Sequence, residues 1–206
     1  MSVIQGVVGA GFDLTTNMPN GLPVAPRMGR QGDTVVSQLQ GRLFESASRG
    51  TLFGVCNQAA VTTTAALATT FTGLAIANPS TSGKLLVLRR FQCAQFAVGA
   101  AAAVGIMVGS GAAAGSLTVR PAKVGTTLNS ATTASAGATI ATPVLERIYG
   151  SVGSLATTGY GLMPAINVEL DGDLIIPPGY YAASYTSVVT TSALLFGFVW
   201  DEVPAV

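Results

Sequence analysis

Three acidic residues, Glu169, Asp171 and Asp173, alternate along the chain and are the first candidates for chemistry. On an extended strand they would share one face, because successive side chains of a strand point to opposite faces. Clustered carboxylate oxygens could hold a Ca²⁺ ion or act as catalytic groups. A full calcium-loop pattern is absent, and a solvent-facing strand edge explains the three acids as well. We favour that interpretation and expect no catalytic residue, no metal ligand and no cofactor, with a bound cation as the alternative.

The chain contains no histidine, the residue that most often serves as a general base or metal ligand at neutral pH. A nucleophile activated by histidine and a zinc site with histidine ligands are therefore excluded. Chemistry carried by carboxylates, tyrosine or lysine stays open. We expect that the protein is not an enzyme.

Two glycine-rich stretches and one pair of arginines do not fit known binding motifs. The glycines of residues 9–11 would have to open a helix to bind a dinucleotide, but prolines from Pro19 onward interrupt any helix. The glycines of residues 109–115 have the wrong spacing and no acidic residue follows at the required distance. Arg89 and Arg90 form the longest basic run, so we expect no nucleic-acid partner. We interpret this pair as the end of a strand that faces a carboxylate of a partner.

The composition suggests that other chains cover much of the surface. Only 9% of the 206 residues are charged, against about 25% in an average globular domain, and 49% are hydrophobic. A soluble monomer needs a charged surface, and this chain has few charges to provide one. We therefore expect a homo-oligomer.

No segment is expected to cross or enter a membrane. Residues 91–119 carry no charge, but they are rich in Ala and Gly and are broken by Gly-Ser-Gly at 109–111. The first basic residue is Arg27, so no positive region precedes an apolar core as in a secretory signal. Cys56 and Cys93 are too few for a disulfide framework.

The first 50 residues differ from the rest of the chain. Three prolines within 19–26 rule out a continuous helix or a central strand there. One short helix is predicted over 34–46, where Asp33 could cap the first turn. We predict an extended N-terminal arm over 1–50, which lies on a neighbouring chain, and a β-domain over 51–206.

The β-domain is expected to be an all-β, jelly-roll-type sandwich. From residue 51 onward the chain is rich in Thr, Val, Ala and Phe, which is typical of short strands separated by turns. About eight to ten strands fit the stretch, the number expected of a jelly roll. Strands are predicted over 52–60, 61–72, 73–77, 84–96, 103–108, 117–120, 166–170, 174–176, 180–187 and 192–200.

The strand over 84–96 is apolar on both faces, which indicates burial between sheets or at a subunit interface. Alternation places Leu86 and Leu88 on one face and Phe91 and Cys93 on the other. Residues 125–142 are rich in Thr, Ser, Ala and Gly and are predicted to form a loop or a long insertion.

Pro177-Pro178-Gly179 is predicted to form a type II turn, because proline fixes the first central φ and glycine supplies a positive φ at the second. The stretch 172–182 places a glycine, a short apolar run and this proline-glycine corner in the order of the second cupin motif, which it resembles. The resemblance implies a jelly-roll corner. Ala182 stands where the cupin histidine would be, which argues against a cupin metal site.

Residues 32–50, GDTVVSQLQGRLFESASRG, are followed by the Thr- and Ala-rich stretch TTTAALATTFTGLAIANPSTSGKLLVLRR. Together they resemble the small accessory β-proteins of tailed-bacteriophage heads. The likeness is one of texture over residues 32–90, without a catalytic or binding motif. It implies an N-terminal arm, a jelly-roll body, assembly as a dimer or trimer, and a place in the virion, after assembly in the host cytoplasm, as a capsid cement or decoration protein.

This resemblance predicts a non-enzymatic structural protein of a phage virion, which stabilises the shell through its arm and through self-association. The residues expected to contact the capsid protein are Arg27, Arg30, Val35, Leu39, Arg42, Leu43, Phe44 and Arg49. Aromatic residues dominate the energetics of many interfaces, so the self-association residues are expected to be Tyr180, Tyr181, Phe196, Phe198 and Trp200. The alternatives are a receptor- or glycan-binding head or fibre protein with a trimeric jelly roll, and a sugar-modifying jelly roll that depends on carboxylates.

Overall fold

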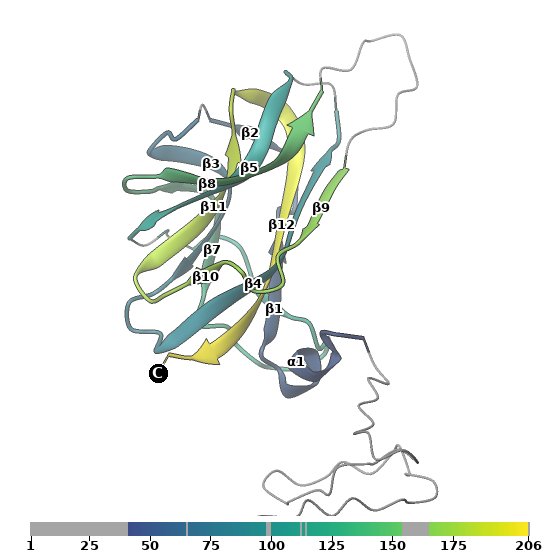
Figure 1. The fold of residues 1–206 in the computed structure, drawn as a ribbon, viewed down its shortest axis with the longest axis vertical. Coiled ribbons are helices and arrows are strands. Elements are labelled where there is room, and N and C mark those ends of the chain that lie inside the picture. Colours follow the sequence, from purple (N-terminus) through teal and green to yellow (C-terminus); the bar gives the residue numbers. More distant parts are fainter. Residues whose placement is uncertain are drawn as a thin grey trace, which may run out of the picture. The chain divides into compact units, whose positions relative to one another are not determined.

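The structure, a computed structural model, describes residues 41–64, 66–97, 100–111, 113, 115–153 and 165–205, apart from the side chains of 191–193. The chain divides into two compact units, Met1–Arg42 and Leu43–Val206. The second unit consists almost entirely of β-strands (Figure 1). Its start at Leu43 lies before the predicted domain boundary at residue 50, because one short helix belongs to it.

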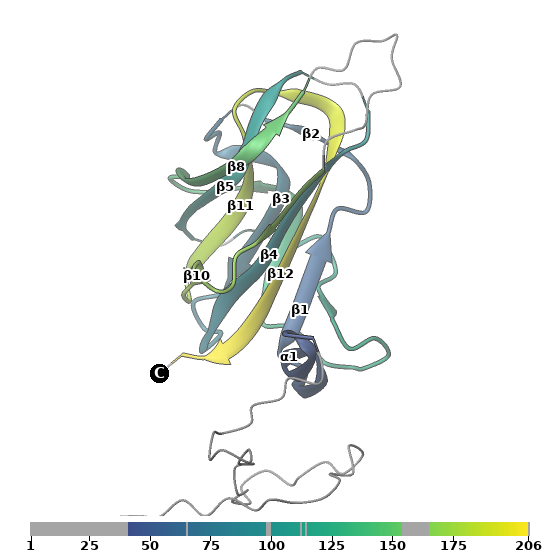
Figure 2. The ribbon, with the colours of Figure 1, turned by 45° about the vertical axis from the view of Figure 1, so that its right-hand side comes forward.

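The strands form two antiparallel sheets, which lie face to face as the two layers of a sandwich (Figure 2). The first sheet contains β1 (Leu52–Cys56), β2 (Val61–Thr63), β4 (Lys84–Gln95), β6 (Arg120–Pro121), β9 (Ala165–Glu169), β10 (Ile175–Ile176) and β12 (Thr190–Pro204). The second sheet contains β3 (Thr70–Asn78), β5 (Ala102–Ser110), β7 (Thr133–Thr139), β8 (Val144–Val152) and β11 (Tyr180–Thr186). The helix α1 (Phe44–Arg49) precedes β1.

The order of the strands is that of a jelly roll. In the first sheet, β12 lies between β1 and β4, and both β9 and β10 pair with the other edge of β4. In the second sheet the order is β3-β11-β5-β8, with β7 added beyond β3. The first and last strands of the domain are therefore neighbours, and the chain returns from one sheet to the other as in two Greek keys. The predicted all-β sandwich is confirmed.

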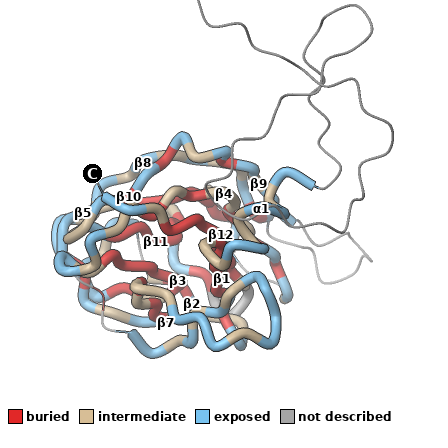
Figure 3. Tube along the Cα trace, turned by 90° about the horizontal axis from the view of Figure 1, so that it is seen from below, coloured by how far each residue is buried: buried red, intermediate tan, exposed pale blue. Residues whose placement is uncertain are grey.

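The core lies between the two sheets, where buried residues of both layers face each other (Figure 3). Its largest members come from β4 and β12: Phe91 packs against Phe196 and Phe198 with ring centroids 6.3 and 5.2 Å apart. Trp200 is fully buried in the same cluster. Alternating apolar residues of two long paired strands thus supply most of the aromatic core.

A bulge in β4 changes which residues face the core. Trp200 of β12 is opposite Leu88, and Val199 is opposite Arg90. Arg89 is therefore an extra residue of β4 that has no residue opposite it on β12. The extra residue reverses the alternation, and Leu88 and Phe91 both point inward. The prediction that Phe91 and Cys93 lie on the face opposite Leu86 and Leu88 is therefore wrong.

The outer face of the second sheet is covered by the chain itself. Phe71, Met107 and Tyr181 point away from the main core and form a second apolar cluster with Ile140, which follows β7. The Tyr181 hydroxyl donates a hydrogen bond of 2.8 Å to the carbonyl of Ala141. The segment between β7 and β8 thus closes this face, whereas the outer face of the first sheet has no such cover over β4 and β12 in the described residues.

Several local predictions can be compared with the structure. The type II turn is confirmed: the N–H of Tyr180 bonds to the carbonyl of Pro177 at 3.3 Å, and Gly179 has a φ of +84°. The loop or long insertion predicted over 125–142 is wrong at β7, where the backbone of Thr133–Thr139 pairs with β3. The strand predicted over 117–120 is reduced to one bridge at Leu117 and the short β6. The strand β8 was not predicted.

Candidate interaction surface

The charged residues are distributed unevenly over the jelly roll. Five stretches of more than 20 residues contain no Asp, Glu, Lys or Arg, namely 51–83, 91–119, 124–145, 148–168 and 174–200. Four of these, all except 124–145, include the connections that define one end of the sandwich. We call this end the loop end and define it by the described residues 57–64, 66–69, 96–97, 100–101, 153 and 187–189.

Neutral hydrogen bonds hold the loop end together. Thr63 of β2 is buried, and its hydroxyl lies 2.8 Å from the hydroxyls of both Thr186 and Thr190. The buried carboxamide of Gln95 donates to the carbonyls of Ala97 and Gly153 at 3.1 and 3.0 Å. Hydroxyl groups and the Gln95 Nε2 donor therefore join these connections, while the buried Oε1 of Gln95 has no hydrogen-bond partner in the described residues.

Large apolar side chains are exposed on the loop end. Phe96, which follows β4, is 69% exposed. Leu67, in the connection between β2 and β3, and Val188 and Val189, between β11 and β12, are exposed as well. An end of the molecule that has no charge and exposes apolar side chains is a candidate for contact with another macromolecule.

Ion pairs concentrate towards the opposite end. Arg89 Nε lies 2.6 Å from Asp201 Oδ2, and Lys84 Nζ lies 2.7 Å from Glu202 Oε2. Both carboxylates are almost fully buried. Buried carboxylates are stable only when they are paired and hydrogen-bonded, so these groups have a structural role.

The Asp201 carboxylate also holds α1 against the first sheet. It accepts hydrogen bonds from Ser46 Oγ at 3.3 Å and Thr51 Oγ1 at 3.5 Å. The helix ends at Gly50, whose φ of +76° gives the left-handed cap that favours glycine. The start of the second unit is thereby held to β12.

The residues predicted to contact a capsid lie partly in this region. Arg27, Arg30, Val35 and Leu39 lie outside the described residues. Arg42 and Leu43 precede the helix, which begins at Phe44. The helix predicted over 34–46 is wrong for Gly41, Arg42 and Leu43, which are not helical, and its part over 34–40 lies outside the described residues. Phe44 is half exposed, and Arg49 makes an exposed ion pair with Glu45 at 2.6 Å. Phe44 and Arg49 are thus accessible on α1 within the described residues.

The residues predicted for self-association are mostly core residues. Phe196, Phe198 and Trp200 are buried between the sheets, and Tyr181 is buried under the 140–141 segment. These four side chains are covered within one chain, so they leave no surface for a second one. Tyr180, at the start of β11, is the exception and is 47% exposed.

The three alternating acids do not form one strand face. β9 ends at Glu169, and Asp171 lies in a turn with a φ of +52°. Glu169 pairs with Arg90 at 2.6 Å, and Asp173 pairs with Arg147. The predicted strand edge is therefore wrong beyond Glu169, and within the described residues no group of three or more Cys, Asp or Glu side chains could hold a metal ion.

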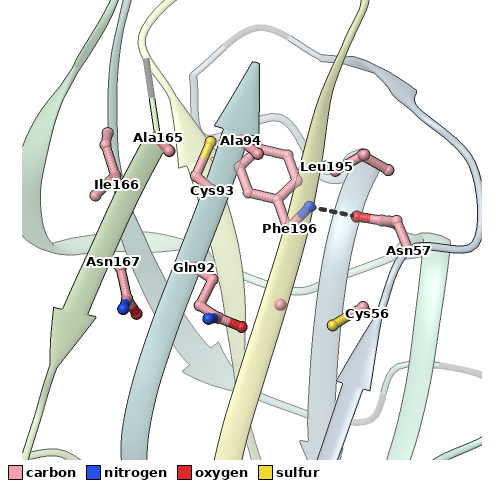
Figure 4. Close-up of a pocket in the computed structure, with 11 residues that line it drawn as sticks. Cys56, Asn57, Gln92, Cys93, Ala94, Ala165, Ile166, Asn167, Leu195 and Phe196 are labelled. Carbon is pink, nitrogen blue, oxygen red and sulfur yellow. Dashed lines mark hydrogen bonds between the residues drawn. The ribbon is translucent and has the colours of Figure 1, made fainter. Parts of the chain in front are cut away.

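The outer face of the first sheet carries an uncharged hollow next to the loop end. Asn167, Gln92, Gly197 and Cys56 are directly opposite one another on β9, β4, β12 and β1. Ala94 is opposite both Ala165 and Leu195 in the adjoining row. Together these residues line an open cavity of about 370 Å³, shown in Figure 4. We call this region the outer-face hollow.

Small side chains create the outer-face hollow. A Cβ at Gly197 would lie 2.9 Å from the sulfur of Cys56 and 3.2 Å from Gln92 Oε1, so glycine leaves the space open between them. The Gln92 and Asn167 carboxamides lie in the same row (Figure 4) and make no side-chain hydrogen bond within the described chain. Their donors and acceptors are therefore available to a partner.

The two cysteines at the hollow differ in accessibility. Burial raises the pKa of the Cys93 thiol to about 12, since its side chain points into the core. Burial also raises the pKa of Cys56, although this residue is exposed. Neither cysteine forms a disulfide. Both thiols are protonated at neutral pH, so the hollow contains no anionic group from the described residues.

The residues of the outer-face hollow were not predicted from the sequence. The one local indication was Gly197, a residue without a side chain in a strand of large side chains, which marks a place where a cavity can form. Gln92 and Asn167 gave no sign, because their proximity depends on the register of β4 and β9. No helix in the described residues is long and apolar enough to cross a membrane. Comparison with protein-family models, with curated proteins and with solved structures finds no match for the chain.

Proposed function

We propose that this chain is a non-enzymatic structural protein of a phage virion, which associates with itself and acts as a cement or decoration protein of the capsid. The observation that carries the proposal is the uncharged loop end together with the adjoining outer-face hollow. A surface without charge and with exposed apolar residues is unfavourable in water and is stabilised when another chain covers it.

The use of the charged residues supports the same proposal. Glu45, Glu169, Asp173, Asp201 and Glu202 are each paired with Arg or Lys in the folded chain. Carboxylates that are paired in this way hold elements together and are poorly placed to act as catalytic acids or bases. The acidic residues therefore favour a structural role over an enzymatic one.

The position of α1 agrees with an arm that reaches a capsid. Phe44 is half exposed and Arg49 is exposed, and the helix that carries them is tied to β12 through Asp201. A contact made by the N-terminal residues would thus be transmitted to the jelly roll. In the proposed role, the arm binds the shell and the jelly roll joins neighbouring copies.

One observation favours a second candidate, a receptor-binding head or fibre protein. Phe96 is an exposed aromatic residue on the loop end, as expected of a surface that binds a cell or a polysaccharide. In that case the loop end would stay free on the particle. The two candidates differ in whether the isolated protein binds bacterial cells.

Two measurements test the proposed function. Light scattering after size exclusion of the full chain should give the mass of a dimer or trimer, and mass spectrometry of purified phage particles from cells that carry the gene should find the chain among the abundant proteins. A variant without residues 1–42 should keep the oligomeric mass and be lost from the particles. A monomeric full chain, or particles that lack the protein, would overturn the proposal. Binding of the isolated protein to host cells would favour the second candidate instead.

A further inference from the structure

The outer-face hollow offers a cavity without an occupant from the described chain, and one exposed aromatic residue stands beside it. Phe96 follows directly after β4, whose residues Gln92 and Ala94 point outward. The alternation of a strand continues to Phe96, two positions beyond Ala94 and about 6.6 Å further along. Phe96 thus lies just past the end of the strand that lines the hollow, and exposed Ala94, buried Gln95 and exposed Phe96 continue the alternation beyond the strand.

We propose that the outer face of β4 and β12 packs against the same face of a second copy, with Phe96 of each chain inserted into the outer-face hollow of the other. The inference rests on the self-association proposed above and names the surface that makes it. In a two-fold interface, residue i of one chain contacts residue j of the other and the reverse. A two-fold axis near Ala94 would place each Phe96 over Gln92 and Gly197 of the second copy.

The charges of this face suit contact with itself. A two-fold axis brings like groups together, so a patch with a net charge would repel its own copy. The lining residues of the hollow include no Asp, Glu, Lys or Arg. Gln92 and Asn167 each carry a donor and an acceptor, so two copies of such carboxamides can pair with each other. Arg90 and Glu169, in the next row, already pair with each other at 2.6 Å.

The lining of the hollow suits an aromatic side chain, and its size leaves room for one. Its volume of about 370 Å³ is more than twice the roughly 150 Å³ of a cavity that holds a benzene ring, and its lining, with Cys56, Ala94 and Leu195, is mostly apolar. Aromatic residues that enter a pocket at the centre of an interface are frequent hot spots. On the outer face of the second sheet, the segment between β7 and β8 covers Phe71, Met107 and Tyr181, whereas no described segment covers the hollow on β4 and β12.

The first test compares Phe96→Asp with Val124→Asp in the full chain by sedimentation equilibrium. Val124 is 94% exposed and far from the hollow in the fold, which makes it a matched control. Phe96→Asp should raise the dissociation constant at least about 30-fold, as expected when a hot spot is removed. Val124→Asp should leave it unchanged. Both positions are exposed, and circular dichroism should give the wild-type spectrum for both variants.

The second test measures the contact directly. Ala94→Cys in a Cys56→Ser background should be cross-linked between chains by a short bis-maleimide reagent, because the proposed axis brings the two copies of residue 94 together at the spacing of two packed sheets, about 10 Å, which is too wide for a direct disulfide. Val124→Cys in the same background should not. A wild-type oligomer that tolerates Phe96→Asp, or that gives no cross-link at position 94, would overturn this interface and leave self-association intact. A monomeric wild-type chain would overturn both this interface and the proposed self-association. A monomer that retains a small molecule in the hollow would overturn both as well, because the hollow would then be a ligand site.

Discussion

Glu202 and Lys84, which lie 118 positions apart, form an ion pair of 2.7 Å across the end of β4 and β12. The Glu202 side chain is 1% exposed, whereas that of Lys84 is 40% exposed. The same carboxylate accepts hydrogen bonds from Ser130, from the N–H of Ala131 at 3.1 Å and from Thr132 Oγ1 at 3.2 Å. One buried carboxylate thus holds the connection between β6 and β7 against the last strand.

Stability should decrease at acidic pH through Glu202. Burial alone would raise its pKa, but the hydrogen bonds from Lys84, Ser130 and Ala131 outweigh burial and lower the pKa below 4.5. A carboxyl with a lowered folded-state pKa contributes stability above its unfolded pKa and loses it as pH falls through the folded value. The free energy of unfolding, from urea denaturation, should therefore fall as the pH drops below about 4.5.

Glu202→Gln isolates this contribution. The variant should lose about 1.5–3 kcal/mol at pH 7, the range for hydrogen bonds to a charged group, and should show a weaker pH dependence below 4.5. Glu146→Gln is the matched control: Glu146 is exposed on β8, and its substitution should change the free energy of unfolding by less than about 0.5 kcal/mol at pH 7. Equal pH dependence in Glu202→Gln and the wild type would contradict the assignment.

The threonine cluster of the loop end gives a second prediction. Thr63 Oγ1 accepts hydrogen bonds from Thr186 Oγ1 at 2.8 Å and from the N–H of Thr190 at 3.2 Å. With both lone pairs used, its own proton is directed to Thr190 Oγ1, 2.8 Å away. Thr63→Val keeps the shape and removes the partner of the Thr190 N–H and hydroxyl, while the Thr186 hydroxyl keeps only its 3.5 Å hydrogen bond to the carbonyl of Thr64. It should cost about 1–3 kcal/mol.

The control for Thr63→Val is Thr139→Val, at the exposed end of β7. This substitution should change the free energy of unfolding by less than about 0.5 kcal/mol. Urea denaturation of the two variants measures the difference. Equal effects would mean that the buried hydroxyl network adds nothing beyond an exposed hydroxyl.

Much of the fold could be predicted from local patterns in the sequence. The strand β4 was predicted almost to its bounds, because its apolar run is long and begins after a turn. The turn at Pro178 and Gly179 was predicted from the chemistry of the two residues, which leaves few alternative conformations. Such features depend on residues that are adjacent in the chain.

Features that depend on pairing between distant strands could not be predicted. The bulge at Arg89 follows from the register of β4 against β12, and it decides which aromatic residues are core. For this reason, Phe196 and Trp200 could not be distinguished from interface residues by sequence. The outer-face hollow likewise depends on the register that brings Gln92 opposite Gly197.

The pairing of β5 with β8 gives a third prediction. Register shifts on both sides of Gly105 and Ile106 leave Tyr149 and Glu146 as extra residues on β8. These bulges bring the carbonyl of Arg147 so close to Gly105 that a Cβ there would clash with it. Gly105→Ala should therefore displace β8 and cost at least about 2 kcal/mol.

Gly137→Ala in β7 is the matched control for Gly105→Ala. A Cβ at Gly137 would meet its nearest atom, the carbonyl oxygen of Phe71, at 3.7 Å, which is an ordinary contact. Since glycine within a strand is less stable than alanine, this variant should be neutral or up to about 1 kcal/mol more stable. Thermal or urea denaturation measures the stability of both variants. A Gly105→Ala variant as stable as the wild type would contradict the close approach of β8 to Gly105.

The two cysteines give a fourth prediction about accessibility. The thiolate is the reactive form, and burial keeps Cys93 protonated with a pKa of about 12, whereas Cys56 is exposed at the hollow. At pH 8, dilute native protein should react with one equivalent of a thiol-specific disulfide reagent, and denatured protein with two. Cys56→Ser should abolish the native reaction and keep one reactive thiol after denaturation. Two fast equivalents in the native state would show that Cys93 is reached from the hollow, and Cys93 would then line the cavity with its sulfur and not with its backbone.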